Sequence, residues 1–289
     1  MRFVQSIMRD GFSLGRAFGI PISANPSLIP IALVLIVGIA SGLEFGLFWN
    51  LVLGVLMVGI VFGSILLHEL GHSLTARAYG IDTRSIILHL FGGVAQIVRE
   101  PRRPAEEFFI AIAGPAVSLA LALIFGCLAF AVAFFAPPTL LWEGVITPLL
   151  GGMTANLVLG IFNLLPGFPM DGGRVLRAWL WHRSGNLPLA TVRAATGGQI
   201  VGYLLIGIGL VRLLGFGDIG GIFMVLIATF ITSLAGLEKR RAAAMTWMAD
   251  GAQPTQGRSW SSAAEPSVRV VEYTVRYPDG REVSFTRRG

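Results

Sequence analysis

Residues 47–77 read LFWNLVLGVLMVGIVFGSILLHELGHSLTAR, an apolar run interrupted near its end by three ionisable residues, His68, Glu69 and His72. A transmembrane helix needs about 20 consecutive, mostly apolar residues. An ionisable group within such a helix is costly in lipid and therefore indicates a functional site. This stretch predicts both a membrane-spanning fold and the place where its chemistry occurs.

The composition of the whole chain agrees with a membrane protein. Of its 289 residues, 54% are hydrophobic and 13% are charged, whereas about 25% are charged in soluble domains. The mean hydropathy is +0.73. The single cysteine, Cys127, lies inside an apolar run and cannot form an intrachain disulfide. Soluble, disordered, collagen-like and disulfide-stapled classes are therefore excluded.

Six segments meet or approach the length of a membrane span. They are residues 28–42, 47–76, 108–136, 145–165, 191–214 and 219–237. We therefore expect an all-α polytopic membrane protein with six transmembrane helices, and we assign residues 28–238 to the transmembrane domain.

The basic residues predict the orientation. All of them except Arg212 lie in the two tails or in alternate loops, whereas the loops around Glu44 and Glu143 contain neither Lys nor Arg. By the positive-inside rule we expect a multi-pass protein of the cell membrane with both termini in the cytoplasm. The formal net charge of +6 then reports topology and contact with the lipid bilayer, so no nucleic-acid partner is expected.

Three cytoplasmic segments have the composition of β-strands. Residues 14–23 (LGRAFGIPIS), within an N-terminal segment 1–27, and residues 83–98 (TRSIILHLFGGVAQIV) are rich in β-branched residues and glycine. They predict short membrane-associated strands in a small sheet. After a linker at 239–266, the tail at 267–289 alternates around a Pro-Asp-Gly turn and predicts a small β-hairpin.

The spacing of the ionisable residues in the second span suggests a metal site. His68 and His72 are four residues apart, so both imidazoles lie on one helical face and can reach one metal ion. Glu69 can approach a metal-bound water without being a ligand. This is the H-E-x-x-H pattern of zinc proteases, in which zinc lowers the pKa of its water to about 7 and polarises the scissile carbonyl. The alternative is a polar cluster that packs helices or accepts a transported ion.

A catalytic zinc site needs a third protein ligand, and the best candidate is Asp171. It follows the fourth span in the segment FNLLPGFPMDGGR (162–174), where Pro166 and Pro169 break the helix. The fourth span would deliver Asp171 to the same cytoplasmic boundary as the histidine pair. The alternative role for Asp171 is an N-cap of the helix at 172–182.

At this point the sequence resembles a known family. HELGH at 68–72 and NLLPGFPMDG at 163–172 resemble the two signature motifs of the site-2 protease family, the intramembrane zinc metalloproteases. Residues 14–27, 91–94 (FGGV) and 113–115 (AGP) are similar to a six-span branch related to the sporulation pro-sigma-factor processing protease.

The resemblance implies a set of roles. His68, His72 and Asp171 would hold one Zn²⁺ per chain, Glu69 would be the catalytic base, and Asn163 and Pro169 would hold the substrate chain or the oxyanion. The roughly 50 residues after the last span do not match the nucleotide-sensing module of that branch or the peptide-binding module of other branches. No nucleotide is therefore expected.

Other residues near the motifs have open roles. Asn163 would donate to the oxyanion or to substrate backbone, or else make a helix-packing hydrogen bond. Phe91, Gly92 and Gly93 would offer an edge for an extended substrate strand. His89 would gate the site or occupy the fourth zinc position, unless it is structural.

The sequence therefore predicts an intramembrane zinc endopeptidase that cuts transmembrane or membrane-tethered proteins near the cytoplasmic face. One alternative is a divalent-metal transporter, which should carry ionisable groups through the membrane depth rather than at one end. Another is an inactive relative that binds membrane proteins, against which the intact Glu69 and the full ligand set argue.

Overall fold

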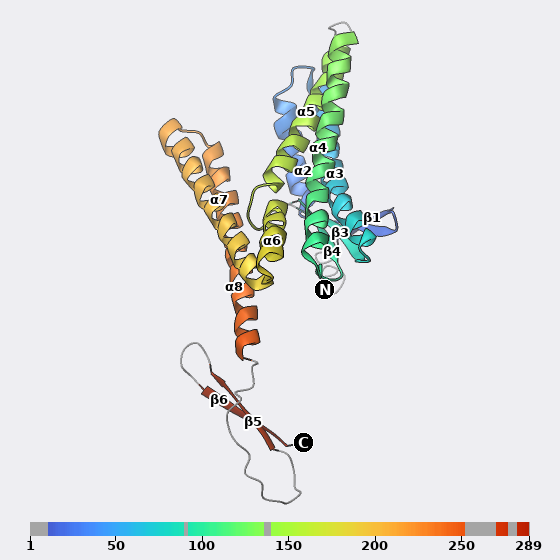
Figure 1. The fold of residues 1–289 in the computed structure, drawn as a ribbon. Coiled ribbons are helices and arrows are strands. Elements are labelled where there is room, and N and C mark those ends of the chain that lie inside the picture. The colour runs from blue at the N-terminus through green and yellow to red at the C-terminus, as the bar shows by residue number, and fades with distance from the viewer. Residues whose placement is uncertain (1–10, 90–91, 136–139, 252–269, 277–281, 289) are drawn as a thin grey trace, which may run out of the picture. The chain divides into compact units, whose positions relative to one another are not determined.

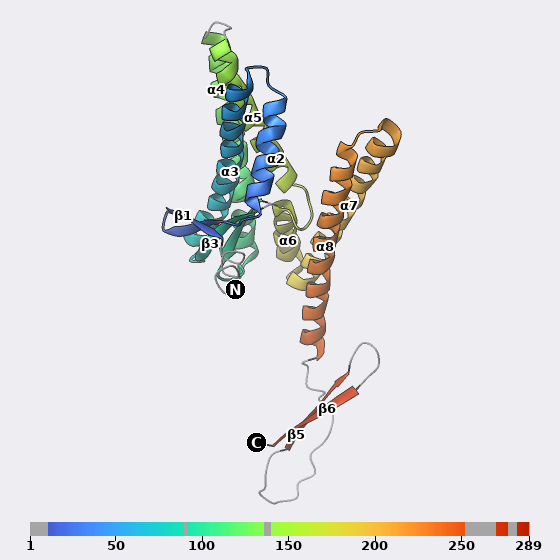
Figure 2. The ribbon, with the colours of Figure 1, turned by 180° about the vertical axis from the view of Figure 1, so that it is seen from behind.

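The computed structural model describes residues 11–89, 92–135, 140–251, 270–276 and 282–288. The chain divides into two compact units, Met1–Ala249 and Asp250–Gly289. Figure 1 and Figure 2 show the ribbon from opposite sides, and in both views the small sheet of the first unit lies at one end of the helices α2 to α5.

Long helices make up most of the first unit. They are α2 (Leu28–Ser41), α3 (Leu47–Ala78), α4 (Pro104–Phe135), α5 (Leu140–Asn163), α6 (Asp171–Ser184), α7 (Leu187–Phe216) and α8 (Gly220–Gly251).

Among the described residues, five helices are long and apolar enough to cross a membrane: α3, α4, the part of α5 from Gly144 to Asn163, α7, and α8 as far as Ala244. The segment expected to be the first span is α2, which has 14 residues. At 1.5 Å per residue it is about 21 Å long, shorter than the roughly 30 Å hydrocarbon core. A multi-pass membrane fold is therefore confirmed, and a sixth span remains a prediction.

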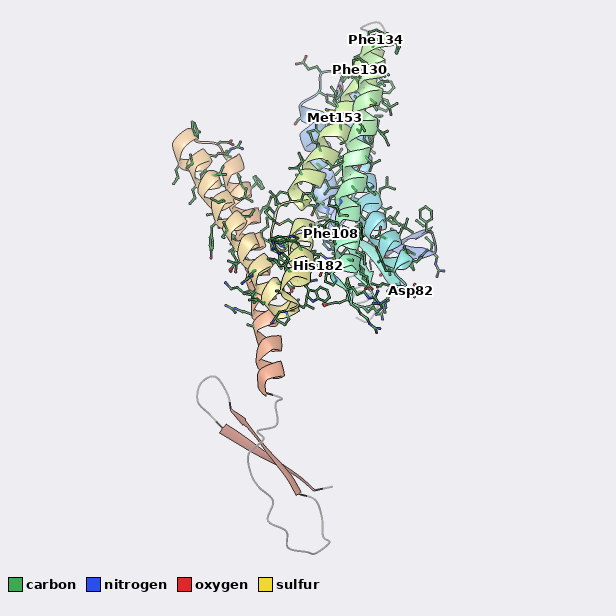
Figure 3. All side chains as sticks on the ribbon, in the orientation of Figure 1. Asp82, Phe108, Phe130, Phe134, Met153 and His182 are labelled. Carbon is green, nitrogen blue, oxygen red and sulfur yellow. The ribbon has the colours of Figure 1, made fainter. Side chains whose placement is uncertain are left out.

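Apolar side chains point outward from these helices, as a lipid environment requires. Figure 3 shows Phe130 and Phe134 near the end of α4 that lies opposite to Asp82, and these two rings are 69% and 71% exposed. Exposure of this apolar surface to water would be unfavourable, whereas in a bilayer the same side chains contact lipid chains.

The last helix extends beyond the apolar pattern. α8 continues to Gly251, although the apolar composition ends near Leu237 and residues 239–266 were expected to be a linker. The sequence EKRRAAAM at 238–245 consists of strong helix formers. The helix therefore continues past the apolar segment because the residues that follow it favour helix formation.

The predicted strands at 14–23 and 83–98 form one sheet, as expected. Its order is β1 (Phe12–Ala17), β2 (Ile20–Ala24), β3 (Thr83–His89) and β4 (Gly92–Ile97). β2 and β3 pair in parallel, while β1–β2 and β3–β4 are antiparallel.

The sheet packs against α3. Ile20 of β2, Leu70 of α3 and Ile86 of β3 form a buried cluster, against which Ala95 of β4 also packs. Because Leu70 lies between Glu69 and His72, this contact brings the edge strand β4 beside the histidine motif.

The second unit contains the predicted C-terminal hairpin. β5 (Val270–Arg276) and β6 (Glu282–Arg288) are antiparallel, with Tyr273 opposite Phe285. The expected hairpin is therefore confirmed for the residues that the structure describes.

Candidate metal centre

Helix α3 places the two histidines one turn apart, as their spacing predicts. His68 and His72 are 3% and 4% exposed, and their Nε2 atoms lie 3.2 Å apart. Both rings therefore point to one buried location.

Helix α4 orients both rings from behind. The Nδ1 atom of His72 lies 2.6 Å from the carbonyl oxygen of Ile110, and Nδ1 of His68 lies 2.8 Å from Oγ of Ser118. A carbonyl oxygen only accepts, so His72 donates from Nδ1, and the Nε2 of its neutral ring keeps a lone pair. Such a partner behind a ligand histidine is the usual arrangement at zinc sites.

Asp171, the first residue of α6, completes the cluster. Its Oδ2 atom lies 3.1 Å from Nε2 of His68 and 3.1 Å from Nε2 of His72. Burial by itself would raise the pKa of Asp171, whereas imidazoles that carry a positive charge lower this pKa well below its usual range. A positive charge between these groups therefore favours the ionised carboxylate of Asp171.

The donor set fits a zinc ion. The ligand atoms of His68, His72 and Asp171 all lie within 4.8 Å of one another, and this is the group of potential metal ligands found within the described ranges. Two imidazole nitrogens and a carboxylate oxygen are a common catalytic zinc set. Lone pairs that converge in a buried place need a cation between them, so the geometry agrees with the predicted site.

Gly114 of α4 makes room for this cluster. A Cβ atom on Gly114 would lie 2.6 Å from Nε2 of His68 and would also overlap Nε2 of His72. The glycine of the segment at 113–115 is therefore explained by the close approach of α4 to the two rings.

Glu69 is held at the edge of the sheet. Its Oε2 atom accepts a hydrogen bond from the backbone N–H of Ala95, at 3.2 Å. A Cβ atom on Gly93 would lie 2.5 Å from Cγ of Glu69, so this glycine leaves space for the glutamate. β4 is an edge strand of the sheet, and the bond from Ala95 places the Glu69 carboxylate at its open side.

The remaining predicted residues are distributed around this centre. Asn163 is the last residue of α5, and its Nδ2 atom donates to the carbonyl of Leu159 at 3.0 Å. Pro169 lies two residues before Asp171 and lines a cavity. Gly92 and Gly93 begin β4, whereas Phe91 lies outside the described residues. Their predicted roles in substrate binding stay predictions.

His89 ends β3 and pairs in register with Gly92. It does not belong to the ligand group found among the described residues. Partial burial lowers the pKa of His89, so its neutral form is favoured. The role of His89 as a gate stays a prediction.

A buried ion pair near the centre escaped the sequence analysis. Glu107 of α4 is 1% exposed, and its Oε1 accepts from Nε of Arg177 in α6 at 2.6 Å, with Nη2 of Arg177 close to the same oxygen. The guanidinium of Arg177 also lies over the ring of Phe168, 5.1 Å from its centroid. These contacts join the helix that orients the histidines to the helix that carries Asp171.

Replacing Glu107 with glutamine should destabilise the protein strongly. The change leaves the Arg177 guanidinium partly buried without its carboxylate, and removing one partner of a buried pair costs about 3–5 kcal/mol. Thermal unfolding of the detergent-solubilised protein would measure the loss.

The matched control is Glu106→Gln, since Glu106 lies on the same helix and, within the described part of the chain, accepts only from the exposed backbone N–H of Arg102. If Glu107→Gln unfolds at the same temperature as Glu106→Gln, the Glu107–Arg177 pair does not stabilise the fold.

Asn156 is a second buried polar residue that sequence reasoning missed. It is fully buried in α5, and its Nδ2 donates to Oγ of Ser64 in α3 at 2.8 Å. An asparagine in an apolar run is typical of a hydrogen bond between helices. Asn156 lies outside the signature motif, whereas Asn163 lies within it.

Comparisons with known proteins agree with this geometry. The sequence profile of peptidase family M50 matches residues 54–136 and 132–207. The putative zinc metalloprotease Rip3 of Mycobacterium tuberculosis is 35% identical over 291 residues, which cover 96% of this chain and 71% of that protein. The putative zinc metalloprotease sll0528 of Synechocystis is 38% identical over 242 residues, covering 81% of this chain and 61% of that protein.

A solved structure is also similar. The site-2 protease from Methanocaldococcus jannaschii shares 32% sequence identity with this chain and superposes with a TM-score of 0.53, covering 79% of this chain and 94% of that chain. Together, the family profile, the relatives and the shared fold show that this chain belongs to peptidase family M50, the site-2 protease family.

Proposed function

We propose that this protein is an intramembrane zinc endopeptidase in which His68, His72 and Asp171 hold the metal and Glu69 is the catalytic base. The observation that carries the proposal is the convergence of two Nε2 atoms and one carboxylate oxygen within 4.8 Å, beside a glutamate that is not part of the ligand group. Membership of family M50 and the zinc metalloprotease relatives support the same chemistry.

When bound, zinc supplies an acidified water and a polarised peptide carbonyl. Glu69 accepts the proton of the attacking water and later gives it to the departing amine nitrogen. The buried environment strengthens these electrostatic effects because little water competes. Asn163 uses one amide hydrogen for Leu159, and we propose that its second hydrogen donates to the oxyanion or to substrate backbone.

The length of α3 indicates the depth of the site. From Leu47 to His68 the helix rises about 32 Å at 1.5 Å per residue, which is close to the full hydrocarbon thickness of roughly 30 Å. The site therefore lies near one membrane face. The basic loops favour the cytoplasmic face of the cell membrane, with both termini in the cytoplasm and α2 as a sixth, short span.

Substrates of such a site are transmembrane or membrane-tethered proteins with a locally extended segment, because a helix occupies its own amide groups. We propose that the open edge of β4 pairs with that segment. The Glu69 carboxylate already bonds the N–H of Ala95 on this edge, and N–H groups of alternate residues point to the same side of a strand. A substrate strand placed there would pass directly beside the catalytic residues.

A photocrosslinking residue at Val94 should therefore capture a substrate bound to the Glu69→Gln protein. Val94 is 45% exposed on β4. Leu33 of α2, 57% exposed, is the matched control and should give little crosslinking. The crosslinking yields are measured by mass spectrometry. Equal yields at the two positions would show that the substrate does not bind at the β4 edge.

The proposed function is tested by measuring zinc content and cleavage of membrane peptides with the purified protein. About one zinc per chain and specific peptide fragments are expected. Zinc uptake into protein-containing liposomes without peptide cleavage would instead identify a transporter, and zinc-dependent binding of membrane proteins without cleavage would identify an inactive relative.

A further inference from the structure

A cavity of about 530 Å³ is lined in part by residues that are close in sequence to the metal centre and its partners. Its lining includes Ile97 at the end of β4, Phe168 and Pro169 in the turn before α6, and residues of α6 and α8. Pro169 is two residues before the ligand Asp171, and Ile97 is two residues after Ala95, the partner of Glu69. The segments that carry Asp171 and the partner of Glu69 therefore also contribute to the cavity lining.

One end of β4 lines the cavity, so a substrate strand paired with β4 would extend toward it. Two residues of a strand span about 7 Å, which is the separation along β4 between Ala95 and Ile97. A substrate side chain two to four residues from the scissile bond would reach the cavity. This step rests on the proposed function and on substrate pairing along β4.

The charged lining has a positive excess. Four arginines and two glutamates line the cavity: Arg99, Arg174, Arg177, Arg241, Glu100 and Glu238. Arg177 is paired with Glu107, and Arg241 with Glu238 at 2.8 Å. Arg99 donates to the carbonyls of Tyr79, Gly80 and Glu100, and within the described ranges it forms no ion pair.

Arg174 is the lining cation best placed to receive an anion. Among the described residues its guanidinium makes no ion pair or hydrogen bond, and the residue is half-buried. It lies in the first turn of α6, where the helix dipole disfavours a cation. A guanidinium can bind a carboxylate through two parallel hydrogen bonds.

We propose that this cavity binds an aspartate or glutamate of the substrate, two to four residues from the scissile bond, with Arg174 as its main partner. Ile97 and Phe168 pack against the methylene groups of that side chain. Glu100 and Glu238 restrict the site to a small anion held at one end.

The test uses synthetic transmembrane peptides that share one apolar segment and carry a single Asp, or Asn in its place, at each position on both flanks of the cleavage site. The zinc-loaded full-length protein should cleave the Asp peptide with about tenfold higher kcat/KM than the Asn peptide at one position, since one charge-assisted hydrogen bond supplies an effect of that size. In Arg174→Gln this ratio should fall to about one. Arg193→Gln, which alters an exposed arginine outside the cavity, should keep the tenfold ratio.

The outcomes separate this inference from the proposed function. Cleavage with an Asp-to-Asn ratio near one at every position would overturn the inference and leave the protease function standing. Absence of cleavage by the wild type would count against the protease function. In that case, crosslinking of benzophenone-labelled Asp peptides to the Glu69→Gln protein still decides the inference, because it measures binding alone. Arg174-dependent binding of phosphatidylglycerol vesicles without any Asp preference would identify a lipid site and overturn the proposal.

Discussion

Replacing Glu69 with glutamine should leave about one zinc per chain and lower kcat/KM for a membrane peptide about 10²- to 10⁴-fold, the range of general acid–base catalysis. The amide keeps the size of the side chain but cannot accept the proton of the attacking water. It should not reduce metal binding, because the proposed ligand group consists of His68, His72 and Asp171. Zinc analysis and peptide cleavage on one preparation would measure both effects.

The matched control for this change is Glu44→Gln. Glu44 is an exposed residue between α2 and α3, so its replacement should leave both zinc content and cleavage at wild-type values. Unchanged cleavage by Glu69→Gln would contradict the mechanism. Loss of zinc from this variant would indicate that Glu69 is itself a metal ligand.

Replacing Asp171 with alanine should weaken zinc binding by about 100-fold or more and abolish cleavage. Loss of a group that merely supports a ligand costs about 10–100-fold in metal affinity, and Asp171 is expected to be a ligand itself. Its Oδ2 lies 3.1 Å from both Nε2 atoms, so its removal leaves two imidazoles without the carboxylate. Competition with a chromophoric chelator would measure the zinc affinity.

Asp82→Ala is the control, because Asp82 is exposed in the loop before β3 and should not affect zinc affinity. Unfolding of the zinc-free proteins should occur at similar temperatures, which separates a ligand from a residue that only caps α6. Wild-type zinc affinity in Asp171→Ala would exclude Asp171 from the metal site.

Local periodicity explains what could be predicted from the sequence. The spacing of His68 and His72 places both rings on one helical face whatever the rest of the fold does. The strands at 14–23 and 83–98 were predictable from composition, and so was the hairpin after residue 267. The end of α8 was not, because helix propensity and hydrophobicity diverge after Leu237.

The supports of the metal centre have no such local signature. A backbone carbonyl at Ile110 and a hydroxyl at Ser118 orient the histidines, and neither belongs to a recognisable motif. The Glu107–Arg177 pair joins residues 70 positions apart, whereas an acidic pair such as 106–107 by itself indicates only the start of a helix.

By itself, the sequence determined the class of protein, the candidate metal ligands and base, and the helical face of the histidine pair, because composition, residue chemistry and helical periodicity are properties of the chain. Only the tertiary structure decided that α4 holds both imidazoles from behind, that β4 bonds Glu69, and that arginines line a cavity beside Pro169. These contacts depend on how helices and strands distant in sequence pack together, and packing brings together groups that no local pattern relates.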